Sequence, residues 1–251
     1  MAKQPGFISS AYFEDYSKSW DSSVDTALKQ LSDKGEFTSE DFEYYVIASS
    51  LFSSKIEGNS LDFNSFYGNR HKKDYPRTKE VEEIENLVEA YKYASENSLN
   101  ETNFLKSHFS LSATLLPENE RGKYRTEQIG IRDSATGRPV YLAVEPKFVE
   151  ELMGQLFTDL KQLLSNELNH SEVFYYASMV HLWIATIHPF GDGNGRAARL
   201  AEKWFLSEKL GQAAWAIASE KYFGITDQNI IKILRSGSII TLYIGKDASR
   251  F

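Results

Sequence analysis

Residues His188–Arg199 read HPFGDGNGRAAR, a stretch that combines an imidazole, a carboxylate, three glycines and two cations. Pro189 ends any helix before it, because its ring excludes a following helical turn and biases His188 toward extended geometry. The three glycines let backbone N–H groups converge on one point without side chains in the way. From Arg196 onward the residues are strong helix formers, so the loop opens onto the N-terminus of a helix. Free N–H donors and the positive end of the helix dipole make such a loop an anion site.

The charged side chains of this stretch suit phosphate chemistry. Arg196 and Arg199 are three residues apart and share one helical face, where their guanidinium groups can clamp phosphate oxygens. Asp192 is the carboxylate of the loop, and proteins commonly hold Mg²⁺ by one or two carboxylates together with substrate phosphates. An imidazole beside a helix N-terminus is biased toward its neutral form, which is the form that a general base requires.

The stretch has three other interpretations. A Ca²⁺ loop starting at Asp192 fails, because Ala197 stands where the invariant glycine belongs and Lys203 where the bidentate glutamate belongs. A hairpin turn at Asn194-Gly195 is disfavoured by the helical character of the residues that follow. A single histidine before a proline is more often structural than catalytic. Only the other residues of the stretch reverse that expectation for His188.

The stretch resembles the active-site signature of the Fic family, His-x-Phe-x-(Asp/Glu)-Gly-Asn-Gly-Arg-x-x-Arg. The resemblance implies a mainly α fold, a helical bundle with a short β-hairpin flap beside the active site. It also implies the activity that most members share, transfer of AMP from ATP to a hydroxyl group on a protein target. By resemblance, His188 is the base that deprotonates the target hydroxyl, Asp192 is the Mg²⁺ ligand, and Arg199 lies near the γ-phosphate of ATP. The remaining assignments are an anion hole and a pair of phosphate-binding arginines, formed by Gly193, Asn194 and Gly195 and by Arg196 and Arg199.

A second motif, SSKIEG at residues 53–58, resembles the inhibitory motif (Ser/Thr)-x-x-x-Glu-(Gly/Asn) of family members whose inhibitory helix precedes the active-site signature. It ends a predicted helix, Ser39–Glu57, that opens with a capping-box pattern at Thr38 and Asp41. A glutamate in the last turn of a helix opposes the helix dipole, and broken local rules often mark function. The resemblance implies that Ser53 and Glu57 are inhibitory and that Glu57 pairs with Arg199. The alternative is a solvated glutamate at a frayed helix end.

A β-hairpin is predicted over about residues 125–144. Apolar residues alternate along Gln128–Arg132 and Pro139–Val144, and a turn at Asp133–Gly137 separates the two runs. In the Fic family such a flap aligns the target by strand addition. An ordinary surface hairpin is the alternative.

Composition limits the remaining possibilities. The chain has 251 residues, is 41% hydrophobic and carries a net charge of −7, so we expect a sizeable core and no general nucleic-acid surface. It contains no cysteine, which excludes disulfides and fits a reducing cytoplasm. No signal peptide or membrane span is visible. The expected partners are ATP and a protein with a Ser, Thr or Tyr hydroxyl, and a homodimer is one expected assembly.

Helical periodicity dominates the chain. The predicted organisation is an N-terminal segment, residues 1–75, that carries the inhibitory motif, and a Fic core with a C-terminal helical tail, residues 76–251. A loop is predicted at Leu61–Pro76. His108 and His181 receive no functional assignment. Besides Ser39–Glu57, helices are predicted at Ser22–Lys34, Thr78–Glu96, Glu101–Leu116, Pro146–Leu164 and Ser171–Ile187.

The C-terminal portion departs from the family pattern, because the Asn and Tyr-rich helix that lines the adenine pocket in many members is replaced by ASEKYFG at residues 218–224. Tyr222 is a candidate for stacking on the base. The sequence therefore leaves alternatives to AMP transfer open: transfer of UMP, GMP or phosphate, and a catalytically silent switch that binds ATP.

Overall fold

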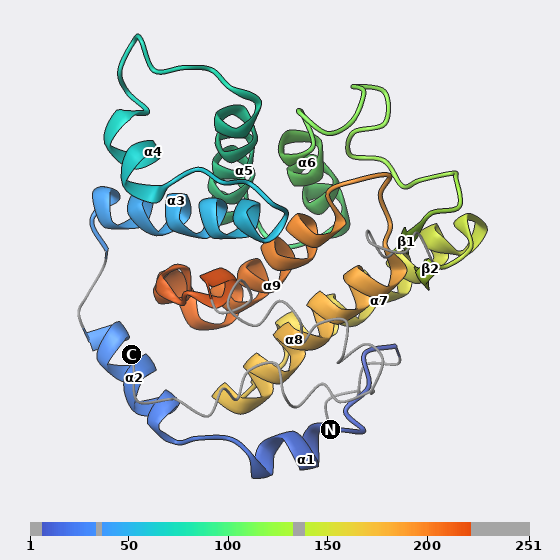
Figure 1. Cartoon of the computed structure of the whole chain (residues 1–251). Coiled ribbons are helices and arrows are strands. Elements are labelled where there is room, and N and C mark those ends of the chain that lie inside the picture. Colours follow the sequence, from blue (N-terminus) through green and yellow to red (C-terminus); the bar gives the residue numbers. More distant parts are fainter. Residues whose placement is uncertain (1–6, 34–36, 133–138, 222–251) are drawn as a thin grey trace.

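The computed structural model describes residues 7–33, 37–132 and 139–221, which are mainly helical (Figure 1). The N-terminal half contains six helices among these residues: α1 (Phe13–Lys18), α2 (Ser23–Asp33), α3 (Ser39–Ile56), α4 (Phe63–Asn69), α5 (Lys79–Glu96) and α6 (Glu101–Leu111). The rest comprises strands β1 (Gly130–Arg132) and β2 (Pro139–Leu142), 3-10 turns η1 (Pro146–Phe148) and η2 (Gly211–Ala216), and helices α7 (Val149–Ser165), α8 (His170–Ile187) and α9 (Asn194–Leu210).

Helix α9 is the centre of the fold. It contacts α3, α5 and α6 on one side and α7 and α8 on the other (Figure 1). Residues 196–206 are all buried, the charged ones included. The predicted phosphate-binding arginines therefore lie inside the bundle, on its central helix.

Local signals explain how the helices that flank the site begin. The predicted capping box of α3 is confirmed, since Thr38 accepts a hydrogen bond from the Asp41 N–H and the Asp41 side chain accepts from Thr38. Asn169 and Glu172 form a second capping box at the start of α8. Gly58, with φ of +97°, follows α3 in the left-handed conformation that ends many helices. Helix α3 therefore ends at Ile56, and Glu57 is its C-cap residue.

The predicted hairpin is short. Strands β1 and β2 are antiparallel, with Gly130 opposite Leu142 and Ile131 opposite Tyr141, and the register is irregular between Ile131 and Arg132. The predicted turn at Asp133–Gly137 lies outside the described residues, as does Tyr222.

Two predicted boundaries are wrong. The expected loop Leu61–Pro76 contains helix α4, because Asp62 caps its first turn by accepting from the Ser65 N–H, and Phe66 is buried against α3 and α5. Helix α6 ends at Leu111 and not at Leu116, and residues beyond it form turns. Periodicity missed α4, since a single cap and a single buried ring decide this seven-residue helix.

One apolar cluster runs through most of the described chain. It joins Tyr16, Leu28 and Val46 from the N-terminal part to Leu87 of α5 and Leu200 of α9. This core continues across residue 75. The division of the chain at that residue stays a prediction. Among the described residues, no helix is long and apolar enough to cross a membrane.

Candidate active site

The loop before α9 is closed by its own side chains. Asn194 Oδ1 accepts from the Phe190 N–H at 2.8 Å, and Asn194 Nδ2 donates to the Phe190 carbonyl at 2.8 Å. Gly193 has φ of +79°, a conformation that favours glycine, and leads directly into the first turn of α9. The side chain of Asn194 therefore braces the loop, and its contribution to an anion site is its backbone N–H, one of the first-turn groups that lack a helical partner.

His188 lies at the C-terminal end of α8 in a left-handed conformation, with φ of 54° and ψ of 60°. The expected extended geometry is wrong, because the His188 N–H continues the helix by donating to the Ile184 carbonyl at 2.9 Å. His188 Nδ1 lies 3.2 Å from the Ala185 carbonyl, an oxygen that only accepts, so Nδ1 carries the proton and Nε2 presents a lone pair. A non-glycine residue held in this conformation is strained, and such strain is concentrated at functional sites.

The surroundings of His188 favour its neutral form. Burial lowers the pKa of His188 below its ordinary value, and the nearby Arg125 charge lowers it further. The Ala185 carbonyl, Glu57 and Asp192 act in the opposite direction without offsetting the effect of burial. The imidazole is thus available as a base at neutral pH, and burial is the main cause.

Arg125 ties the flap region to the loop, a role that sequence reasoning missed. Its Nε donates to the His188 carbonyl at 2.7 Å, its N–H donates to the Pro189 carbonyl at 2.9 Å, and its Nη2 donates to the Val144 carbonyl at 2.5 Å. Its place at the start of the predicted hairpin was the available signal. The backbone around His188 is therefore braced from both ends of the flap.

His108 braces the other side of the loop. Its ring is stacked on Phe190 with centroids 3.5 Å apart, its Nε2 lies 3.0 Å from the Asp192 carbonyl, and its Nδ1 accepts from the Gly122 N–H. These partners require a proton on Nε2 and none on Nδ1. Burial lowers the pKa of His108 to about 4, although the Asp192 carbonyl opposes the shift. Nothing in the sequence distinguished this histidine, because its partners are far away in the chain.

A pH-dependent stability follows from His108. The unfolded chain binds a proton at this residue below about pH 6.5, whereas the folded chain resists protonation until about pH 4. The free energy of unfolding should therefore fall by about 3 kcal/mol between pH 7 and pH 4 through this residue alone. Chemical denaturation of the wild type and of His108→Gln at both pH values measures it. Equal pH dependence in the two proteins would contradict a neutral buried His108.

Asp192 is exposed on the loop, and its Oδ1 accepts from the Gly193 N–H at 2.6 Å. The described residues contain no group of three or more histidine, cysteine, aspartate or glutamate side chains that could hold a metal ion. A single exposed carboxylate suits Mg²⁺, which retains several waters and takes its other ligands from substrate phosphates. Asp192 therefore fits a metal that arrives with a phosphorylated ligand, and does not fit a permanently held ion.

Glu57 and Ser53 both contact Arg199, from 142 and 146 residues away. Glu57 Oε1 lies 2.6 Å from Arg199 Nη2, and Ser53 accepts from Arg199 Nε at its hydroxyl, 2.9 Å away, and from Nη2 at its carbonyl, 3.0 Å away. The Glu57 carboxylate approaches the backbone of Gly195 so closely that a Cβ there would overlap Oε1. A carboxylate thus lies against the first turn of α9, where the sequence predicted an anion.

The charges around Glu57 are those of an anion site. Burial raises the pKa of Glu57, but Arg199, through its charge and its hydrogen bond, more than offsets this, and Arg196 and His188 add to the lowering. The net pKa is lowered. The Glu57 carboxylate therefore lies within the electrostatic influence of the two predicted phosphate-binding arginines and the predicted base.

Arg196 has a carboxylate partner of its own, Glu83 of α5, whose Oε1 lies 2.5 Å from Arg196 Nη2. Each of the two predicted phosphate-binding arginines therefore contacts a different glutamate. Glu83 was not singled out, because it belongs to the amphipathic pattern of a helix 113 residues away from Arg196.

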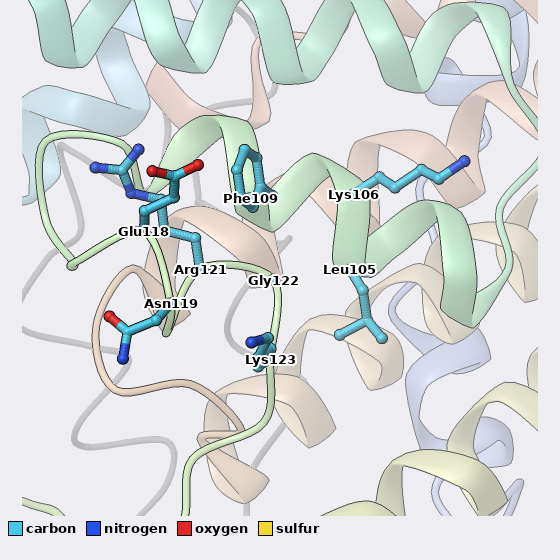
Figure 2. Close-up of a pocket in the computed structure, with 8 residues that line it drawn as sticks. All are labelled: Leu105, Lys106, Phe109, Glu118, Asn119, Arg121, Gly122 and Lys123. Carbon is cyan, nitrogen blue, oxygen red and sulfur yellow. The ribbon is translucent and has the colours of Figure 1, made fainter.

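A separate pocket of about 650 Å³ lies beside α6 (Figure 2). Phe109 and Leu105 of α6 face a turn that contributes Arg121, Gly122 and Lys123. None of the predicted site residues lines it. The Arg121 guanidinium donates to two backbone carbonyls, so part of the local positive charge is used to hold the turn. The predicted anion site lies outside this pocket, and the Glu57 carboxylate is located there, against Arg199 and Gly195.

A comparison with family models matches residues 98–206 to the Fic/DOC family. The matched range contains the HPFGDGNGRAAR loop, Arg125 and His108, and excludes Ser53, Glu57 and Glu83. The search of curated proteins finds no match.

Solved structures share the fold. A Fic family protein from Desulfovibrio desulfuricans is similar with a TM-score of 0.70 and 20% identity, over 93% of this chain and 68% of that chain. Fic-1 (residues 134–508) from C. elegans gives a TM-score of 0.55 and 18% identity, over 85% and 72% of the two chains. A Fic domain containing signaling protein from Bacteroides thetaiotaomicron gives 0.54 and 16%, over 92% and 96%. At these identities the likeness establishes the fold.

Proposed function

Because the chain belongs to the Fic family and carries its Fic/DOC domain at residues 98–206, we propose that it is an autoinhibited protein adenylyltransferase. In the proposed reaction, AMP moves from ATP to a Ser, Thr or Tyr hydroxyl of a protein target, or of the chain itself, and pyrophosphate leaves. One observation carries the autoinhibited form of this proposal: the Glu57 carboxylate contacts Arg199 against the first turn of α9, in the place that suits a phosphate.

The proposed chemistry assigns the proton to His188. Its Nε2 takes the proton of the target hydroxyl, whose oxygen attacks the α-phosphorus while the bond from that phosphorus to the pyrophosphate oxygen breaks. Positioning and charge stabilisation dominate such phosphorus chemistry. The N–H groups of Asn194 and Gly195 and the guanidinium groups of Arg196 and Arg199 are the proposed donors to the phosphate oxygens. The Gly193 N–H joins them once it leaves Asp192 Oδ1.

Asp192 is the residue that would hold Mg²⁺. When bound with ATP, this ion would neutralise charge on the phosphates and on the departing pyrophosphate. The chain's own contribution is to keep the Asp192 carboxylate exposed at the mouth of the loop while His108 fixes its backbone carbonyl. ATP and Mg²⁺ are thus the proposed co-substrate and cofactor.

The hairpin is the proposed alignment surface for the target. Tyr141 of β2 donates to the Thr186 carbonyl, two residues before His188, and Leu142 is 69% exposed. A target segment that pairs with the backbone of this hairpin would lie close to the base. Arg125 links the end of the flap to the His188 carbonyl and supports the same arrangement.

A silent ATP-binding switch is the second candidate, and the observation in its favour is that both arginines are already paired with glutamates. Intact-mass measurement separates the candidates. The wild type and Glu57→Gly are incubated with Mg²⁺ and ATP, UTP or GTP, and the mass added to the chain or to proteins of a cell lysate identifies the transferred group. We expect addition of AMP from ATP, with more in Glu57→Gly. Addition of UMP, GMP or phosphate, or no addition at all, would contradict the proposal.

A further inference from the structure

Glu83 connects three helices through one oxygen atom. It lies on α5 and is 8% exposed. Its Oε1 accepts from Arg196 Nη2 of α9 at 2.5 Å and from the Ser54 hydroxyl of α3 at 2.9 Å. Helices α3, α5 and α9 meet in this region (Figure 1). A buried carboxylate with two donors is well satisfied, so the local energetics favour a fixed position for its partner arginine.

Arg196 is held by this contact and keeps unused hydrogen-bonding capacity. It is 6% exposed, and its Nε has no hydrogen-bond partner among the described residues. A buried N–H donor without a partner is unfavourable, and each such group in a folded protein calls for an explanation. A bound phosphate oxygen would satisfy it, because guanidinium groups recognise phosphate through several N–H donors in one plane.

We propose that Glu83 is a positioning residue that fixes Arg196 through its Nη2 and leaves its Nε for a polyphosphate oxygen. The inference rests on the proposed function, since it requires that the loop before α9 bind a polyphosphate. Glu83 acts through Arg196 and needs no contact with the ligand.

Glu83 differs from Glu57 in ways that separate positioning from inhibition. The Glu57 side chain is 33% exposed at the end of α3, whereas that of Glu83 is 11% exposed within α5. Glu57 can leave Arg199 when the last turn of α3 moves. Glu83 stays with α5, and the Ser54 hydroxyl orients its carboxylate toward Arg196. A carboxylate that stays in place supports its arginine, and one that can leave competes with a ligand.

Binding of inorganic tripolyphosphate in the presence of Mg²⁺, measured by calorimetry in the Glu57→Gly background, tests the inference. Glu83→Gln should raise the dissociation constant about 10-fold or more, because hydrogen bonds to charged groups contribute on that scale. In a chain that also carries Arg196→Ala, the same change should alter the constant by less than about 2-fold, since contacting residues are non-additive. Glu89→Gln is the matched control. It removes an exposed carboxylate from the same helix and should leave binding unchanged.

The sign of the effect decides between the alternatives. Tighter binding by Glu83→Gln would show that Glu83 competes with the ligand, and unchanged binding would show that Arg196 does not depend on it; either result overturns the inference. If Glu83→Gln fails to fold, Glu83→Asp keeps the charge but retracts the carboxylate, and should also weaken binding. Unchanged affinity in that variant overturns the inference as well.

Tripolyphosphate carries no base and no transferable nucleotide, so this result is independent of which group the protein transfers. Failure of the Glu57→Gly parent to bind it would overturn the anion site, and with it the proposed function. If the Glu57→Gly parent binds tripolyphosphate and Glu83→Gln leaves the dissociation constant unchanged, the positioning role alone is overturned.

Discussion

Replacing His188 by alanine in the Glu57→Gly background should lower the rate of AMP transfer by ~10²–10⁴-fold, the usual effect of removing a general base. ATP binding should stay within about twofold of the parent, because general-base removal acts on the chemical step and leaves the N–H groups and arginines of the anion site in place. Single-turnover transfer of labelled AMP, together with calorimetric ATP titration, measures the two quantities separately. A transfer rate within a factor of about five of the parent would remove His188 from the chemistry.

The pH profile provides an independent test of the same assignment. A neutral imidazole accepts the proton, so transfer should be constant near neutral pH and should fall as the pH drops through the pKa of His188, which burial places below its ordinary value. Glu57 raises that pKa in the wild type, so its removal should extend activity further toward acid pH. His71→Ala is the matched control, because His71 is an exposed histidine outside the described contacts of the loop. It should change neither the rate nor the profile.

Local sequence rules were sufficient where a structural feature depends on near neighbours. The capping box of α3, the glycine that follows it and the opening of α9 after Gly193 are set by residues within a few positions of one another. The family resemblance predicted that Glu57 pairs with Arg199, and Glu57 Oε1 lies 2.6 Å from Arg199 Nη2. The inhibitory role of that contact and the catalytic role of His188 stay predictions.

The remainder of the site is made by contacts between distant parts of the chain. His108 reaches the carbonyl of Asp192 across 84 residues, and Glu83 reaches Arg196 across 113. In the sequence each is one polar residue in an amphipathic helix, and periodicity only predicts whether it faces the core. Packing decides which polar groups become neighbours, so a single sequence cannot identify them. The left-handed His188 belongs to the same class, because a braced loop overrides the extended preference of a residue before proline.

Replacing Glu57 by glycine should raise self-modification and target labelling by at least about 5-fold, because coupling of ~1–3 kcal/mol between two sites corresponds to roughly 5–150-fold. The carboxylate contacts Arg199 Nη2 and lies against Gly195, so we expect Glu57 and the γ-phosphate of ATP to compete for the Arg199 guanidinium. Under the proposed autoinhibition, ATP binds in an unproductive pose while Glu57 is in place, and removing Glu57 returns Arg199 to the phosphate. Transfer of AMP from α-labelled ATP measures the gain. The wild type and Glu57→Gly are compared at equal concentration after their folding has been confirmed.

The gain should require the arginine that Glu57 contacts. Combining Glu57→Gly with Arg199→Ala should remove most of it, a non-additivity expected of contacting residues. Lys55→Gly is the matched control, because it introduces the same flexible residue into an exposed position of the last turn of α3 and keeps the carboxylate. A similar gain from Lys55→Gly would attribute the effect to loosening of the helix end. If Glu57→Gly folds, binds ATP and transfers no faster than the wild type, Glu57 is a charged residue at a helix end, and regulation of this site requires another explanation.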